Sequence, residues 1–76
     1  MKTAPTPTKD TETRLREAIQ RELMRCDRNV TPAVCKRTST LEGYKYVEDT
    51  IINMVIGQGL MPSACIAQLE SEWSTE

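Results

Sequence analysis

Residues 39–59 read STLEGYKYVEDTIINMVIGQG, and this run predicts one amphipathic helix with a marked beginning and end. Ser39 followed three residues later by Glu42 is a capping-box sequence, in which the serine side chain accepts from a free helical N–H. Gly57 and Gly59 predict the end, because glycine adopts the left-handed conformation that closes many helices. Between these signals apolar residues recur at helical spacing. They are Leu41, Tyr44, Val47, Ile51 and Val55, flanked by Ile52 and Met54. We therefore expect a helix over 40–56.

The segment before this run predicts two further helices. Asp10 or Thr11 is suited to the N-cap of a helix over 11–26. Its apolar face would carry Leu15, Ala18, Ile19, Leu23 and Cys26. A short helix over 32–37 follows, because Thr31 suits an N-cap and Pro32 the first helical position. Val30 and Cys35 would then pack together as a hydrophobic staple.

After Gly59, Pro62 predicts the start of a last helix, which runs to about residue 73 with Ile66, Leu69 and Trp73 on one face. The Pro-x-x-Cys of 32–35 recurs at 62–65, so these two helices begin in a similar way. No segment alternates as a strand would. The sequence predicts an all-α protein, a small bundle of three to four short helices. Residues 1–9 predict a disordered tail, and 10–76 a single helical domain.

Composition predicts a small core and a charge asymmetry. Among 76 residues there are no phenylalanines, one tryptophan and two tyrosines, so a second copy would add buried surface and we expect a homodimer. The net charge is −1. Residues 1–38 hold nine basic and five acidic side chains (+4), and residues 39–76 hold one basic and six acidic (−5). Opposite-signed halves can pair head to tail, within one molecule or between two, and the alternative is two ordinary solvated surfaces.

The residue types present argue against catalysis and against a cofactor. The chain has no histidine, which removes the commonest general base and nitrogen ligand. Its three cysteines are on different predicted helices and form no C-x-x-C, so neither a metal site nor a disulfide framework is expected. Glycine stands only at 43, 57 and 59, which excludes a phosphate-binding loop. We expect a non-enzymatic protein without a cofactor.

The same sequence features favour a cytoplasmic protein without a membrane partner. An odd number of cysteines outside any disulfide framework is typical of a reducing compartment. The start, MKTAPTPTKDTETR, contains no apolar segment of a signal peptide. The longest mainly apolar stretch, 51–56, is too short to span a bilayer.

A stripe of arginines is the first candidate binding surface. On a helical wheel its members fall within about 60° of one another, away from the apolar face of the 11–26 helix. They are Arg14, Arg21, Arg25 and Arg28. Such a stripe suits nucleic acid or an acidic partner protein. The alternative is an ordinary solvated face, partly neutralised by Glu17 and Glu22.

Three other residues are candidates for partner binding. Glu48 lies on the apolar face of the 40–56 helix, where it either edges the core or reaches an arginine of the 11–26 helix, within one chain or across a dimer. Tyr46 lies on the polar side of its helix, and Trp73 is either a core residue or an anchor, since both residue types are frequent interface anchors. A helix-turn-helix is disfavoured, because the 62–73 helix lacks basic residues and carries two glutamates.

Parts of residues 15–56 resemble a known family. The relevant runs are Leu15-x-x-Ala18-Ile19, Cys26-Asp27-Arg28-Asn29-Val30-Thr31 and Val47-x-x-Thr50-Ile51-x-x-x-Val55. They resemble the small enterobacterial biofilm-development regulators, also described as two-component-system connector proteins. The resemblance implies three helices, a dimer and a regulatory role without catalysis. This chain departs from the family at Cys26, where glycine is usual, at Ser39, which comes early after the second helix, and in the extra helix after Gly59.

The sequence therefore predicts a small regulatory or adaptor protein that binds a partner protein through helix surfaces. One alternative is a nucleic-acid-associated regulator that uses the arginine stripe. Another is a phage- or plasmid-type inhibitor of a host protein. The sequence identifies neither the partner nor the pathway.

Overall fold

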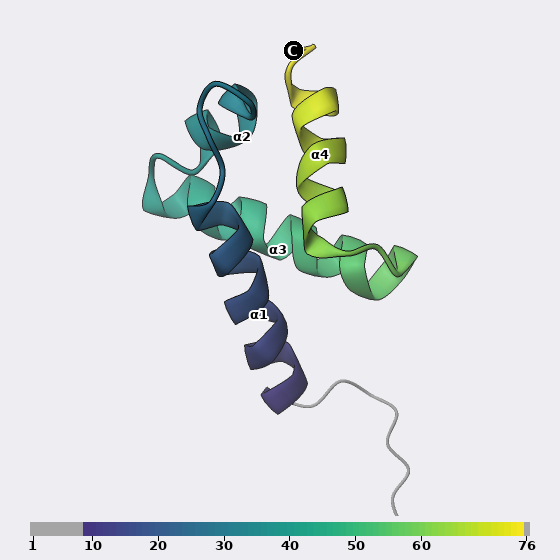
Figure 1. Cartoon of the computed structure of the whole chain (residues 1–76). Coiled ribbons are helices and arrows are strands. Elements are labelled where there is room, and N and C mark those ends of the chain that lie inside the picture. Colours follow the sequence, from purple (N-terminus) through teal and green to yellow (C-terminus); the bar gives the residue numbers. More distant parts are fainter. Residues whose placement is uncertain (1–8, 76) are drawn as a thin grey trace, which may run out of the picture.

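The computed structural model describes residues 9–75 as four α-helices, and no strand occurs among them (Figure 1). The helices are α1 (Lys9–Met24), α2 (Pro32–Arg37), α3 (Leu41–Gln58) and α4 (Pro62–Trp73). The predicted all-α bundle is confirmed. Of the disordered tail predicted over 1–9, residues 1–8 lie outside the described residues, and Lys9 already belongs to α1.

The two C-terminal helices form a corner against which the others pack. α3 runs across the middle of the molecule, and α4 leaves its end at an angle of 116° (Figure 1). α3 and α4 each contact all three other helices, so α1 and α2 are both held by this pair.

α1 begins and ends earlier than the predicted range of 11–26, and Asp27 explains its end. The N–H groups of Arg25 and Cys26 donate to carbonyls three residues back, at 3.1 and 3.2 Å, which tightens the last turn. The Asp27 carboxylate then accepts from the Asn29 N–H at 2.8 Å, and the backbone carbonyl of Asp27 accepts from the Thr31 N–H at 2.7 Å. Local bonds of this kind compete with helical ones. Arg25 and Cys26 therefore lie outside the helix.

α2 has the predicted range and the predicted N-cap residue, Thr31, but not the predicted staple. Val30 is 70% exposed, so it forms no buried staple with Cys35. The Thr31 hydroxyl makes no cap bond to α2 and instead donates to the Asp27 carbonyl at 3.1 Å. The predicted staple is therefore wrong, whereas Thr31 is the N-cap of α2 as predicted, without a side-chain bond to the helix.

The free N–H groups of α2 are bound by a side chain from another helix. The two carboxylate oxygens of Glu70, on α4, accept from the N–H groups of Ala33 and Val34 at 3.1 and 2.9 Å. A carboxylate is favoured at a helix N-terminus, where unsatisfied N–H groups carry partial positive charge. Glu70 thus attaches a six-residue helix, which is too short to be stable alone, to α4.

The first turn of α3 is capped one residue later than the sequence indicates. Thr40 is the N-cap, and its Oγ1 accepts from the Gly43 N–H at 3.0 Å. Ser39 donates instead to the Lys36 carbonyl at 2.7 Å, because its hydroxyl lies at the end of α2. The predicted Ser39–Glu42 capping box is therefore wrong.

α3 continues to Gln58, beyond the predicted end at 56. Gly57 is still helical, and the left-handed cap is Gly59, with φ of 70°. The Gly59 N–H donates to the Val55 carbonyl at 3.0 Å. Only the second of the two glycines therefore acts as the stop signal.

The repeated Pro-x-x-Cys has the same backbone role in both places. Cys35 donates its N–H to the Thr31 carbonyl, and Cys65 donates to the Met61 carbonyl, each at 3.0 Å. In both cases the cysteine closes the first helical turn over the proline. Neither α2 nor α4 has a side-chain bond from its N-cap residue.

One apolar core joins the four helices. Its buried members are Ile19, Leu23, Val34, Val47, Ile51, Ile52, Met54, Cys65, Ile66 and Leu69. Most of them lie on the predicted apolar faces, but Val34 and Cys65 were not among the predicted face residues. Leu41, which was, is 72% exposed at the start of α3. The core is aliphatic, and the aromatic residues Tyr44 and Trp73 pack only against its edge.

Glycine is required at position 43 by the approach of α2 to α3. A Cβ atom there would lie 1.8 Å from the carbonyl oxygen of Arg37 and 3.0 Å from Thr40 Oγ1. Both contacts are with the segment that ends α2 and starts α3. At Gly57, by contrast, a Cβ would meet nothing within 4 Å.

The two glycines should therefore respond in opposite directions to the same change. Gly43→Ala is expected to lower the free energy of unfolding by about 2 kcal/mol, because backbone must move to admit the methyl group. Gly57→Ala is expected to raise it by about 0.5 kcal/mol, since alanine favours helix and nothing obstructs it. Urea unfolding followed by circular dichroism measures both. Equal effects at the two positions would contradict the close approach at Gly43.

The Glu70 cap makes a second prediction. Glu70→Ala should lower the free energy of unfolding by about 1–2 kcal/mol and speed amide hydrogen exchange at Ala33 and Val34. Glu72→Ala is the matched control, because Glu72 is exposed and its carboxylate accepts from Gln68 of its own helix, at 3.3 Å. If the Ala33 and Val34 amides exchange at the same rate in both variants, Glu70 does not cap α2.

Candidate partner-binding surfaces

Two predicted site residues meet where α3 and α4 come together with the end of α2. The rings of Tyr46 and Trp73 are stacked, with centroids 6.3 Å apart and planes inclined by 29°. The guanidinium carbon of Arg37 lies 4.4 Å from the centroid of the Trp73 ring, within the range of a cation–π interaction. Tyr46 is 57% exposed, so the cluster is open to solvent on one side.

A groove of about 650 Å³ opens beside these rings, and we call it the aromatic groove. Its walls are Ala33, Lys36, Arg37, Thr40, Glu42, Gly43, Tyr46 and Trp73. The lining combines the two aromatic rings with two basic groups and one carboxylate. Such a lining is suited to an apolar or aromatic side chain with acidic groups beside it.

Glu48 is buried and committed to bonds within the chain. Its side chain is 7% exposed; Oε1 lies 3.0 Å from Nη1 of Arg16, and Oε2 accepts from Gln20 Nε2 at 2.6 Å. Arg16 also contacts Glu12 at 3.1 Å and Asp49 at 3.2 Å. Glu48 thus reaches an arginine of α1 in the same chain, which is one of the two arrangements expected from the sequence.

The four stripe arginines are all exposed, but they do not form one helical stripe. Arg14 and Arg21 project from α1, Arg25 lies in the turn after it, and Arg28 lies further along that turn. Because α1 ends at Met24, the helical wheel does not apply to Arg28. Arg25 lies 3.8 Å from Glu22, a long ion pair at an exposed position.

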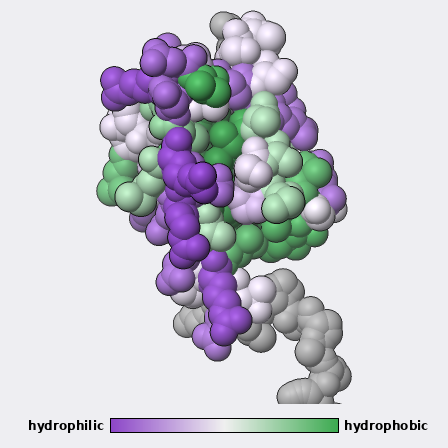
Figure 2. All heavy atoms as spheres, in the orientation of Figure 1, coloured by the Kyte–Doolittle hydropathy of each residue, from purple (hydrophilic) through white to green (hydrophobic). Residues whose placement is uncertain are grey.

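Two hollows flank α1 on the side of the α3–α4 turn. The first, which we call the Ile56 hollow, has a volume of about 490 Å³ and is lined by Thr11, Glu12, Arg14, Leu15, Ala18, Val55 and Ile56. Ile56 is 55% exposed at its edge. Figure 2 shows α1 as a hydrophilic band with apolar surface beside it, toward the end of α3. Exposed apolar surface of this kind often marks an interaction site.

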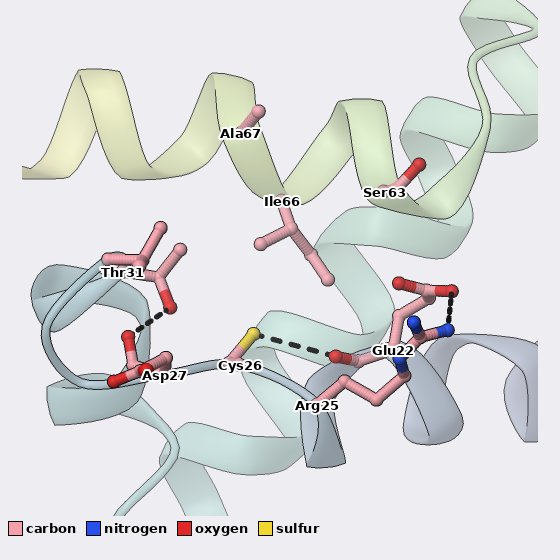
Figure 3. A pocket seen from close by; sticks show the side chains of 9 residues that line it. Glu22, Arg25, Cys26, Asp27, Thr31, Ser63, Ile66 and Ala67 are labelled. Carbon is pink, nitrogen blue, oxygen red and sulfur yellow. Dashed lines mark hydrogen bonds and ion pairs between the residues drawn. The ribbon is translucent and has the colours of Figure 1, made fainter.

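The second hollow, which we call the Cys26 hollow, lies between the end of α1 and the start of α4. Its volume is about 330 Å³, and its walls include Cys26, Val30, Ser63, Ile66 and Ala67. In Figure 3 the Ile66 side chain points from α4 toward the Cys26 thiol, which donates to the Glu22 carbonyl at 3.6 Å. The Glu22–Arg25 pair forms its rim.

The thiols are placed for packing. Burial raises the pKa of Cys26 and of Cys65, so both stay protonated near neutral pH and are poor nucleophiles. All three cysteines are free. Within residues 9–75 no three side chains of the metal-ligating types are grouped as a site.

Sequence reasoning missed Lys36 and Arg37 as members of a site. They end a short helix whose last turn is ordinary in sequence, and Arg37 and Trp73 are 36 positions apart. A basic pair in a last helical turn is also what any helix C-terminus favours, so the local pattern gave no signal. Only the packing of α2 against α4 brings them to the aromatic residues.

Comparisons with protein-family models, with curated proteins and with solved structures found no match. The resemblance to the biofilm-development regulators therefore stays a prediction. Among the described residues no single helix is long and apolar enough to cross a membrane; α3 and α4 meet that criterion only when taken together across their bend.

The contacts of Glu48 with Arg16 and Gln20 predict that two neighbouring substitutions in α3 change the free energy of unfolding by different amounts. Glu48→Gln should lower the free energy of unfolding by about 1.5 kcal/mol, because a buried, charge-assisted hydrogen bond is lost. Asp49→Asn removes the other α3 carboxylate from Arg16, but its side chain is 60% exposed, so the expected change is below about 0.5 kcal/mol. Urea unfolding at neutral pH compares them. A larger effect at Asp49 would refute the buried network.

Proposed function

We propose that this protein is a small regulatory or adaptor protein that binds a partner protein through the aromatic groove. The observation that carries the proposal is the contact of Tyr46, Trp73 and Arg37 at a solvent-open groove. Tyrosine, tryptophan and arginine are the residue types that most often dominate interface energetics. Their rings are already stacked, so little side-chain entropy remains to be lost on binding.

The charges around the groove indicate the chemistry of the partner segment. Lys36 is exposed, Arg37 lies over Trp73, and among the described residues Glu42 is the carboxylate in the lining. A segment with an apolar or aromatic anchor beside acidic residues would fit these groups. In this proposal the apolar contact supplies affinity and the charges set orientation.

The proposal extends to a cytoplasmic homodimer, following the expectations from the cysteines and from the small core. Two exposed apolar side chains in the hollows beside α1, Val30 and Ile56, support self-association. The nucleic-acid alternative has less support, because Glu12, Glu17 and Glu22 stand among the arginines of α1 and Arg25 is near Glu22. A nucleic-acid surface would gain affinity from each unneutralised arginine.

Site-specific photo-crosslinking in cells tests the proposed function. A photoreactive residue replaces Lys36, which lines the groove, and in a control it replaces Asn53, which is exposed elsewhere on α3. A protein cross-linked from position 36 alone is then purified and its affinity for the wild-type chain measured. Tyr46→Ala should weaken that affinity about tenfold or more, and Asn53→Ala should leave it unchanged.

Two results would count against the proposal. An affinity that Tyr46→Ala does not change would show that the groove is not the binding site. Cross-links to RNA or DNA, together with binding that Arg21→Glu and Arg25→Glu abolish and salt weakens steeply, would establish the nucleic-acid alternative.

A further inference from the structure

The flank of α1 that carries both hollows is partly apolar and has charges at fixed spacing. Ala18 lies at its middle, and its small side chain permits close approach of another helix. Arg14 lies four residues before Ala18 and Glu22 four residues after it, so the three share one stripe along the helix. Arg14 is exposed, and the Glu22 side chain is 33% exposed.

The charges of this stripe are complementary to those of a second, antiparallel copy of the same stripe. Arg14 and Glu22 are eight residues apart, roughly 12 Å along the helix, so they do not contact each other within one chain. In an antiparallel pair of α1 helices centred on Ala18, however, each arginine lies opposite the other chain's glutamate. Both ion pairs then form at once, as a two-fold interface requires.

We infer that two copies of this chain pair through α1 in antiparallel orientation, about a two-fold axis at Ala18. The inference rests on the proposed homodimer and names its interface. Arg14 pairs with the partner's Glu22, and Glu22 with the partner's Arg14. The aromatic groove, formed by the far ends of α2, α3 and α4, takes no part and stays open to a different protein.

The hollows are also complementary under this two-fold axis. The Ile56 hollow borders the first half of α1 and the Cys26 hollow borders the second half, both on the side of the α3–α4 turn. Reversal of α1 therefore brings the exposed Ile56 of one copy toward the partner's Cys26 hollow, whose walls include Ile66 and Ala67 (Figure 3). An exposed side chain on each copy is thereby buried by the other.

A second copy is the occupant that this surface fits best. Unlike charges at equal distances on either side of Ala18 satisfy the self-complementarity that a two-fold interface requires, and a foreign helix imposes no such symmetry. Each copy also offers both the protruding side chain, Ile56, and the hollow that receives it. The small aliphatic core gives the chain a further reason to bury this surface.

Charge reversal tests the register of the pair. Light scattering over a concentration series should give a dimer for the wild-type chain. Arg14→Glu alone and Glu22→Arg alone each place like charges opposite each other twice, and each should weaken dimerisation on the order of tenfold or more. An equimolar mixture of these two variants should form a heterodimer, because both pairs are then of opposite sign. Native mass spectrometry identifies that heterodimer.

The apolar contact has its own variant and control. Ile56→Glu should weaken dimerisation roughly 100-fold, since a carboxylate would replace the apolar contact with Ile66 and Ala67 and would enter a hollow that already holds Glu22 and Asp27. Leu41→Glu is the control, because Leu41 is 72% exposed on the same helix, at the opposite end. It should leave dimerisation unchanged. Circular dichroism of each variant confirms that the helices are retained.

The results of these experiments distinguish failure of the α1 interface from failure of the homodimer or of binding at the aromatic groove. A wild-type chain that is monomeric throughout the series overturns the homodimer and this interface, while binding at the aromatic groove is decided by the cross-linking experiment. A dimer that persists in Arg14→Glu, Glu22→Arg and Ile56→Glu overturns the interface alone. Single variants that weaken dimerisation but fail to form the heterodimer overturn the antiparallel register.

Discussion

The contact between the end of α2 and the start of α3 is the constraint on which the candidate site depends. The Arg37 carbonyl lies where a side chain at position 43 would be, so the two helices meet at backbone distance only because Gly43 is there. That approach, together with the attachment of α2 to α4 by Glu70, leaves Arg37 over Trp73 of α4. The aromatic groove is therefore a result of these contacts rather than of the aromatic residues alone.

Two carboxylates connect helices that the small core holds only weakly. Glu48 joins α3 to α1 through Arg16 and Gln20, and Glu70 joins α4 to α2 through two backbone N–H groups. Polar contacts of this kind are directional, whereas aliphatic side chains pack in many similar ways. In a chain without phenylalanine, they fix which parts of the helices lie together. Both operate between segments more than 25 residues apart in sequence.

The sequence predicted the helices well because their signals are local. Apolar spacing, prolines at first helical positions and a closing glycine located all four, and the wrong details, such as Ser39 for Thr40, concern one or two residues at helix ends. The candidate site was predicted only in part. Tyr46 and Trp73 were identified by residue type, but their contact with Arg37 depends on packing between distant segments. The Glu70 cap likewise has no local signature, because an acidic residue in α4 looks like any solvated side chain.

The single tryptophan of the chain contacts both an arginine and a tyrosine in the lining of the groove. Its indole therefore senses α2, α3 and α4 at the same time. Intrinsic emission excited at the red edge of the absorption band comes from this one ring, with no other indole to obscure it. The chain thus carries its own optical reporter, which responds separately to loss of the helix assembly and to anything that covers the ring.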